Sequence, residues 1–165
     1  MPTVSTVFAS LAEALLKETQ NVFGSRLVSV AIYGSVGRGT ARPDSDLDVL
    51  LVVRDLSKER LARMAELEAL EYGMTGAFAA ARTQGIQSCL SPVVKSPERL
   101  AAGTPLLFDM VEDAKILLDR DGFLAGVLAK MRHRMQELGS QRIWRGSRWY
   151  WVLAPGHKPG EEIEF

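Results

Sequence analysis

The feature that most constrains this chain is a loop rich in glycine and charge that separates two apolar runs. Residues 27–33 read LVSVAIY and residues 48–53 read DVLLVV, and both runs are apolar and β-branched enough to predict strands buried in a sheet. The sequence between them, GSVGRGTARPDSDL, holds three glycines, two arginines and two aspartates. The loop therefore places flexible backbone and charge at one end of a buried sheet, where a functional site is expected.

The Gly-Ser step after the first predicted strand has the chemistry of a polyphosphate site. Gly34 has no side chain to keep a ligand away from the backbone N–H groups, and Ser35 adds a hydroxyl donor. Arg38 and Arg42 follow in the same loop and can neutralise phosphate charge. We expect these four residues to bind the phosphates of a nucleotide.

Two aspartates at the end of the loop have the spacing of a metal site. Asp46 and Asp48 stand at alternate positions as the second strand begins, so the period of a strand directs both carboxylates to one face, about 7 Å apart along the chain. Like charges on one face repel unless a cation lies between them. A magnesium ion bound by both carboxylates and by substrate phosphates meets that need, and we expect Asp46 and Asp48 to bind it.

Ordinary turn chemistry is the alternative interpretation of the loop, because Asp44, Ser45 and Asp46 also suit a hairpin. Gly-Ser, ten residues and Asp-x-Asp would nevertheless arise by chance in a chain of this length only roughly a few times in a thousand. Two familiar phosphate motifs are excluded. Thr40 has no lysine before it, as a nucleoside-triphosphatase loop requires, and the order of the glycines does not match a dinucleotide fingerprint.

The pattern of Gly-Ser at 34–35 and Asp-x-Asp at 46–48 resembles that of the polymerase β-like nucleotidyltransferases, in particular their small stand-alone members, the minimal nucleotidyltransferases. The likeness is strong over residues 27–53. It implies that Gly-Ser positions a nucleoside triphosphate and that the catalytic pair Asp46 and Asp48 binds Mg²⁺, two ions when the triphosphate is bound. The implied reaction is transfer of a nucleoside monophosphate to an acceptor hydroxyl, with release of pyrophosphate.

One position departs from the family pattern. Members usually carry a third carboxylate on a later strand, whereas the predicted third strand, residues 86–94, reads IQSCLSPVV without an acid. Ser88 is the expected position of the missing carboxylate, and Ser91 is the second choice. General-base help contributes about 10²–10⁴-fold, so we expect slow or lost turnover with surviving nucleotide binding unless another acid substitutes in space. The candidates are Glu71, Glu112 and Asp113.

The remaining segments predict a mixed α/β (α+β) domain, with a mixed sheet of about four to five strands flanked by helices in a nucleotidyltransferase fold. Apolar residues at helical spacing predict helices over residues 5–23, capped by Ser5, over 57–81, broken near Gly73 and Gly76, and over 123–138. Ser-Pro-Glu at 96–98 predicts a further helix start, with helix in pieces to residue 112. Residues 114–118 and 148–153 predict two more strands.

We expect residues 1–154 to form a single domain and residues 155–165 a loose tail. The composition, with 165 residues, 47% of them hydrophobic and 20 basic against 20 acidic, is that of an ordinary globular domain rather than a polyanion-coating protein. The sequence shows neither a signal peptide nor an apolar stretch long enough to span a membrane, and we expect a cytoplasmic protein. The single cysteine, Cys89, excludes a disulfide framework and is expected to be a buried, inert thiol.

Residues 130–158 mix basic and aromatic side chains, with seven Lys or Arg against one acid. Trp144, Trp149, Tyr150 and Trp151 are interleaved with them. Such a mixture can stack bases and bind phosphates. The alternation of Trp149 and Trp151 favours instead a strand whose tryptophans close the core, and this is our expectation.

Three functional hypotheses follow. The first is a nucleotidyltransferase whose acceptor is a small molecule, a nucleic-acid end or a protein side chain. The second is a nucleotide-binding or partner-binding module with weakened catalysis. The third comes from the resemblance, because small members of the family occur as antitoxins that nucleotidylate or mask a helical partner toxin of the HEPN type. Pyrophosphate release separates the first two, and a neighbouring gene for a small all-helical protein would favour the third.

Overall fold

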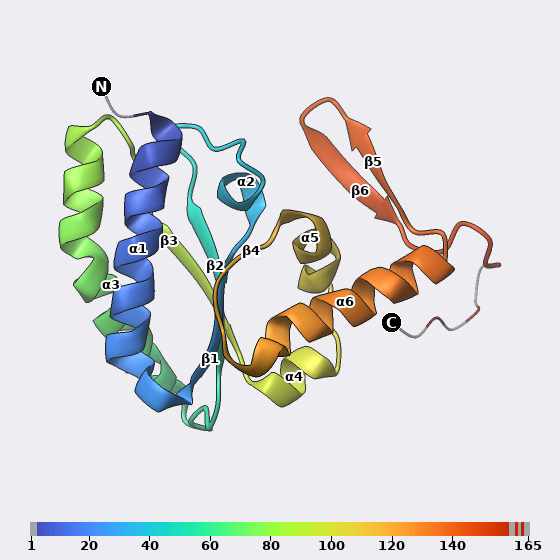
Figure 1. Ribbon diagram of the computed structural model, residues 1–165, viewed down its shortest axis with the longest axis horizontal. Helices are drawn as coiled ribbons and strands as arrows, with labels where there is room; N and C mark the ends of the chain where they lie inside the picture. The colour runs from blue at the N-terminus through green and yellow to red at the C-terminus, as the bar shows by residue number, and fades with distance from the viewer. Residues whose placement is uncertain (1–2, 159–160, 162, 164–165) are drawn as a thin grey trace.

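The computed structural model describes residues 3–158, 161 and 163, and its centre is a mixed sheet of four strands (Figure 1). The strands are β1 (Leu27–Ile32), β2 (Leu47–Val53), β3 (Leu90–Lys95) and β4 (Lys115–Asp119), in the spatial order β3-β2-β1-β4. β1 is antiparallel to both of its neighbours, whereas β2 and β3 are parallel. The predicted mixed α/β class is confirmed.

Helices cover both faces of this sheet. Two long helices, α1 (Val4–Phe23) and α3 (Arg60–Thr83), pack on one face, and α4 (Pro97–Ala101), α5 (Leu106–Asp113) and α6 (Phe123–Glu137) pack on the other (Figure 1). β2 reads as a continuous apolar run because its odd-numbered residues enter the first core and its even-numbered residues Leu50 and Val52 enter the second. Short 3₁₀ turns, Gly24–Arg26 and Arg120–Gly122, connect α1 to β1 and β4 to α6.

Two details of the helices differ from the sequence-based expectation. The cap of α1 is Thr3, whose hydroxyl accepts a hydrogen bond from the Thr6 amide, so Ser5 lies inside the first turn. α3 is continuous through Gly73 and Gly76. A Cβ at Gly73 would come within 2.6 Å of the Glu18 carboxylate, so this glycine lets α1 and α3 approach closely rather than ending the helix.

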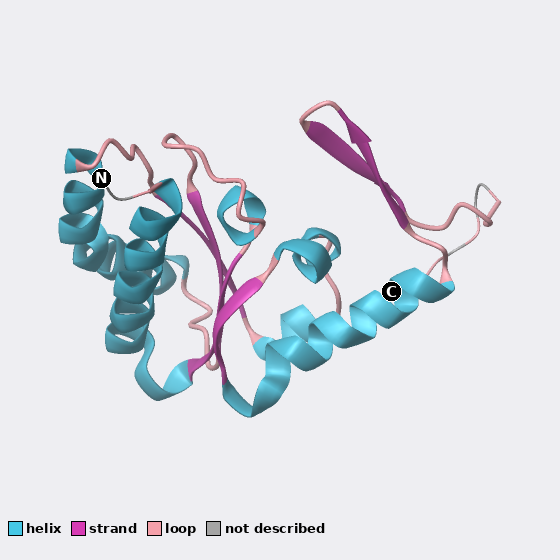
Figure 2. Ribbon diagram, turned by 45° about the horizontal axis from the view of Figure 1, so that its top comes forward, coloured by secondary structure: helices cyan, strands magenta, loops and turns pink. Residues whose placement is uncertain are grey.

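The C-terminal part of the chain forms a separate β-hairpin. Its strands, β5 (Gln141–Arg145) and β6 (Arg148–Val152), make a two-stranded sheet that extends past the end of α6 on the side of α5 (Figures 1 and 2). The strand near 148–153 was expected, but β5 was not, because its short polar sequence carries no strong strand signal. Residues 159–160, 162 and 164–165 of the expected tail lie outside the described residues.

Candidate nucleotide site

The Gly-Ser step forms a one-turn helix, α2 (Gly34–Gly37), at the end of β1. Gly34 has a positive φ of 65°, which favours glycine, and a Cβ at this position would lie 2.3 Å from Oδ2 of Asp48. The Tyr33 amide donates to the Asp48 carbonyl over 3.0 Å, which holds the two strand ends together. The turn therefore packs directly on the second of the two predicted metal ligands.

The two aspartates lie at the start of β2 with different exposure. Asp46 is exposed just before the strand, and Asp48 is half-buried within it. Burial is the main reason that the pKa of the Asp48 carboxyl is raised, and the negative charge of Asp46 raises it further. The pKa of the Tyr33 phenol is also raised, mainly because the phenol is itself partly buried and further because of the charge of Asp48. A pair of anionic oxygens in this position is stabilised by a cation.

The position opposite Asp48 on the neighbouring strand is Ser91. β3 begins at Leu90, so Ser88 precedes the strand, and the parallel register pairs Asp48 with Ser91. A hydrogen bond from the Ser91 side chain lowers the pKa of Asp48 and so partly opposes the effect of burial. Ser88 is instead buried, and its hydroxyl has no hydrogen-bond partner among the described residues. The register favours Ser91, the second choice, over Ser88 as the residue beside Asp48, and the position of the missing carboxylate stays a prediction.

The three acids that were candidates to replace the missing carboxylate have different surroundings. Asp113 is nearly fully buried and is engaged by arginines, and Glu112 is exposed on the wall of a cleft. Glu71 is exposed and close enough to raise the pKa of Cys89. Within residues 3–158, 161 and 163, no group of three acidic, histidine or cysteine side chains is arranged to hold a metal ion.

Cys89 is exposed, contrary to the expected buried thiol. Its sulfur lies 3.0 Å from Oδ1 of Asp46 and donates a hydrogen bond to it, which raises the pKa of the thiol. The apolar sequence around Cys89 suggested burial, but the residue precedes β3 at the rim of the site, where the sheet ends.

The two loop arginines differ in their surroundings. Arg42 is exposed; its backbone amide donates to the Ser45 hydroxyl at 2.9 Å and its carbonyl accepts from the Ser45 amide at 3.1 Å, whereas its guanidinium has no hydrogen-bond partner among the described residues. Arg38 donates from Nη1 to Oδ2 of Asp113 at 2.6 Å, and its guanidinium lies over the Trp149 ring at 4.4 Å. Arg42 is therefore free to meet an anion, whereas Arg38 already compensates a buried carboxylate.

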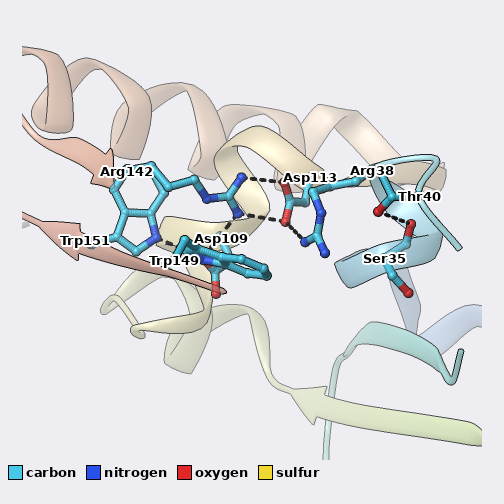
Figure 3. A network of polar contacts seen from close by, with 8 residues as sticks. All are labelled: Ser35, Arg38, Thr40, Asp109, Asp113, Arg142, Trp149 and Trp151. Carbon is cyan, nitrogen blue, oxygen red and sulfur yellow. Dashed lines mark hydrogen bonds and ion pairs between the residues drawn. The ribbon is translucent and has the colours of Figure 1, made fainter. Parts of the chain in front are cut away.

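Asp113 joins the Gly-Ser turn to the C-terminal hairpin (Figure 3). Besides Arg38, it accepts two hydrogen bonds from Arg142 of β5, at 2.9 and 2.8 Å, and these raise the pKa of that guanidinium. The backbone of Asp113 also lies against α2, since a Cβ at Gly37 would come within 2.2 Å of the Asp113 carbonyl oxygen. The sequence did not predict this network, because its members are far apart along the chain.

A second acid of α5 holds the hairpin tryptophans. Asp109 Oδ1 accepts hydrogen bonds from the indole N–H groups of Trp149 and Trp151, each at 2.8 Å (Figure 3). Trp151 packs against the core under α5 and α6, as expected of a core tryptophan. Trp149 instead lies between two guanidinium groups, outside both cores. The expectation that both tryptophans close the core is therefore correct for Trp151 alone.

A cleft of about 890 Å³ lies between the loop after α2 and the hairpin. Ser35 and Arg42 are among its lining residues on the loop side, and Arg142 and Trp144 on the hairpin side. The cleft is large enough for a nucleotide, since ligand pockets commonly span about 300–1,000 Å³.

Part of the chain is similar to a known protein family. Residues 12–81, which include Gly34, Ser35, Asp46 and Asp48, match the nucleotidyltransferase domain family. Over these residues, the resemblance to nucleotidyltransferases that the motif spacing predicts is confirmed.

A relative from Methanocaldococcus jannaschii bears the provisional name of protein adenylyltransferase. It is 28% identical over 125 residues, which cover 74% of this chain and 80% of the relative. The match and this relative both support the class of transferase that the sequence predicts, a nucleotidyltransferase.

Two chains from solved toxin–antitoxin structures also align with this chain. One comes from a complex with AMP-PNP, with 19% identity, a TM-score of 0.49 and coverage of 78% of this chain and 92% of that chain. The other comes from a tri-AMPylated Shewanella oneidensis HEPN toxin in complex with an MNT antitoxin, with 16% identity, a TM-score of 0.46 and coverage of 78% and 90%.

Among the described residues, no helix has the length and hydropathy needed to cross a membrane.

Proposed function

We propose that this chain transfers the adenylyl group of ATP to a hydroxyl of an acceptor, with a protein side chain as the acceptor class that the adenylyltransferase relative supports. One observation carries the proposal: Gly34 packs against Asp48, so that the phosphate-binding turn and the carboxylate pair form one site. Small molecules and nucleic-acid ends are the other acceptor classes that present a hydroxyl. ATP and a protein acceptor both occur in the cytoplasm, where we expect the chain to act.

The residues present fit a magnesium ion. Asp46 and Asp48 offer hard oxygen donors, and burial together with the charge of Asp46 raises the pKa of Asp48, so a cation between the two would stabilise the ionised carboxylates. Bound there, Mg²⁺ would neutralise the charge of the phosphates beside the two aspartates. The protein's own contribution is to present the Gly34 backbone, the Ser35 hydroxyl and the Arg42 guanidinium to the triphosphate, because these groups are placed at the turn and at the cleft wall.

The reaction balances as a substitution at the α-phosphorus of ATP. The acceptor oxygen forms a bond to the α-phosphorus, the bond from that phosphorus to the bridging oxygen breaks, and pyrophosphate leaves. The acceptor proton passes to water, because Ser91 occupies the position opposite Asp48 where a carboxylate would accept it. We therefore expect slow turnover.

The test uses the purified chain with labelled ATP, Mg²⁺ and a cell lysate, and follows both transfer of label and release of pyrophosphate. Asp46→Asn and Asp48→Asn should abolish magnesium-dependent transfer, whereas Asp44→Asn, an exposed acid in the same loop, should not. Parallel reactions with labelled GTP, CTP and UTP establish the base preference. Undiminished transfer by the Asp46→Asn Asp48→Asn double variant would show that the site is assigned wrongly.

The serine at position 91 favours a second candidate, a nucleotide-binding or partner-binding module with weakened catalysis. In that case ATP and Mg²⁺ should raise the melting temperature without any release of pyrophosphate or transfer of label. The family resemblance suggests the partner, a helical toxin of the HEPN type that the chain would mask as an antitoxin. A neighbouring gene for a small all-helical protein, and a complex between the two purified chains, would support this second candidate.

A further inference from the structure

One face of the C-terminal hairpin consists of aromatic rings around an arginine. Trp144 pairs with Trp149 and Arg142 pairs with Trp151 across the two strands, so the alternation of the strands puts all four side chains on the same face. The Arg142 guanidinium lies 5.4, 4.6 and 5.4 Å from the ring centroids of Trp144, Trp149 and Trp151. The arginine is mostly buried and holds the rings in one assembly.

Trp144 differs from the other two tryptophans in what it contacts. Trp149 and Trp151 donate hydrogen bonds to Asp109 and are half-buried, whereas the Trp144 side chain is 49% exposed. Its ring lies 5.0 Å from that of Trp149 at an angle of 48°, so Trp149 supports it while much of its own surface remains accessible. An indole held in this way offers an ordered aromatic surface.

The exposed Trp144 indole lines the cleft that extends to the phosphate-binding turn. Trp144 lines this cleft of about 890 Å³ together with Ser35 and Arg42. A ligand held by its phosphates at Ser35 and Arg42 can therefore extend across the cleft toward Trp144. A nucleoside triphosphate has both parts, an anionic chain and a planar aromatic base.

We propose that Trp144 is the surface on which the base of the bound nucleoside triphosphate stacks. The proposal rests on the proposed function, because it takes the triphosphate to lie at the Gly-Ser turn. Stacking on an indole tolerates different bases, since every base has a π-face, so Trp144 supplies affinity for the nucleoside more than discrimination among nucleosides.

The link between the hairpin and the turn supports this role. Asp113 binds Arg38, which follows α2, and Arg142, which stands beside Trp144 in the aromatic face. The buried carboxylate therefore fixes the stacking surface relative to the phosphate-binding turn before a ligand arrives. Such preorganisation reduces the entropy that binding would otherwise cost.

The test compares two ligands that differ only in the nucleoside. Titration calorimetry with Mg²⁺ measures the Kd of ATP and of inorganic tripolyphosphate for the wild type and for Trp144→Ala, Trp144→Phe and Tyr150→Ala. Tyr150 is a matched control, because it is 45% exposed on the opposite face of the same hairpin. Thermal unfolding of each variant checks that the fold is retained.

Trp144→Ala is expected to weaken ATP binding about 5- to 150-fold, the equivalent of about 1–3 kcal/mol, and to leave tripolyphosphate binding unchanged. Trp144→Phe should recover much of the loss, and Tyr150→Ala should bind both ligands like the wild type. Equal ATP affinity in Trp144→Ala and the wild type overturns the stacking role and leaves the proposed function intact. If neither ligand binds the wild type, the proposed function fails, and the stacking role fails with it.

Discussion

Asp48 of β2 lies directly opposite Ser91 of β3 in the parallel ladder, and a side-chain hydrogen bond joins the two residues. The relationship places a hydroxyl beside the Asp48 carboxylate, and we take this position as that of the third carboxylate in the family pattern. We therefore expect position 91 to limit the rate of transfer, because a serine neither binds magnesium well nor accepts a proton readily.

The substitution Ser91→Asp should raise the rate of transfer from ATP. A carboxylate beside Asp48 adds a metal ligand and a proton acceptor, and general-base help of this kind contributes about 10²–10⁴-fold. The measurement is the initial rate of pyrophosphate release with Mg²⁺ and lysate. Ser88→Asp is the matched control and should give no increase, because Ser88 precedes the strand and has no register partner in β2. A rate that stays at the wild-type level in Ser91→Asp would contradict the role of this position.

The substitution Gly34→Ala should disrupt the candidate site. Its Cβ would lie 2.3 Å from Oδ2 of Asp48, and its positive φ costs about 1–2 kcal/mol for a residue other than glycine. Gly39→Ala is the control, because Gly39 also has a positive φ but nothing lies within 4 Å of its Cβ. Chemical unfolding should show a larger loss for Gly34→Ala, and only this variant should lose stabilisation by ATP and Mg²⁺. Equal losses in the two variants would mean that the contact with Asp48 has no consequence.

The substitution Asp113→Asn should lower the free energy of unfolding by about 3–5 kcal/mol, the usual cost of removing one charged partner of a buried ion pair. Asp113 is 2% exposed, and its carboxylate compensates the charges of Arg38 and Arg142. Urea denaturation measures the change. Glu112→Gln, at the exposed neighbouring position, should stay within about 0.5 kcal/mol of the wild type. Similar midpoints for both variants would argue against a structural role for the Asp113 network.

The raised pKa of Asp48 predicts a specific dependence of stability on pH in the absence of nucleotide and metal. The folded state binds the proton of this carboxyl more tightly than the unfolded state does, so its contribution to stability is present at low pH and is lost as the pH rises through the folded-state pKa. Asp48→Asn, which cannot ionise, should therefore be more stable than the wild type at pH 7, and the difference should disappear below the ordinary Asp value of about 3.9.

Denaturant unfolding at several pH values measures this difference in the free energy of unfolding. Asp44→Asn provides the comparison, because Asp44 is exposed in the loop. Saturating Mg²⁺ and ATP should reverse the order at pH 7, since only the ionised Asp48 can bind the cation. A wild type that is more stable than Asp48→Asn at pH 7 without ligand would contradict the electrostatic origin of the shift.

The amino-acid sequence by itself determined the parts of the site that lie close together along the chain. Gly34, Ser35 and Asp46 belong to the connection between β1 and β2, and Asp48 to the start of β2, so their spacing and the period of a strand were enough to predict that they lie together. The helices were predictable for the same reason, because amphipathic periodicity is local, apart from the cap at Thr3 and the continuous helix through Gly73.

Only the tertiary structure decided which distant residues complete the site. The choice of Ser91 over Ser88 depends on the register between β2 and β3, and no periodicity within either strand specifies that register. The ion pairs of Asp113 with Arg38 and Arg142 form only because α5 and the hairpin pack beside the Gly-Ser turn. A buried carboxylate must be paired with positive charge, and the fold can supply that charge from arginines that are far away in the sequence.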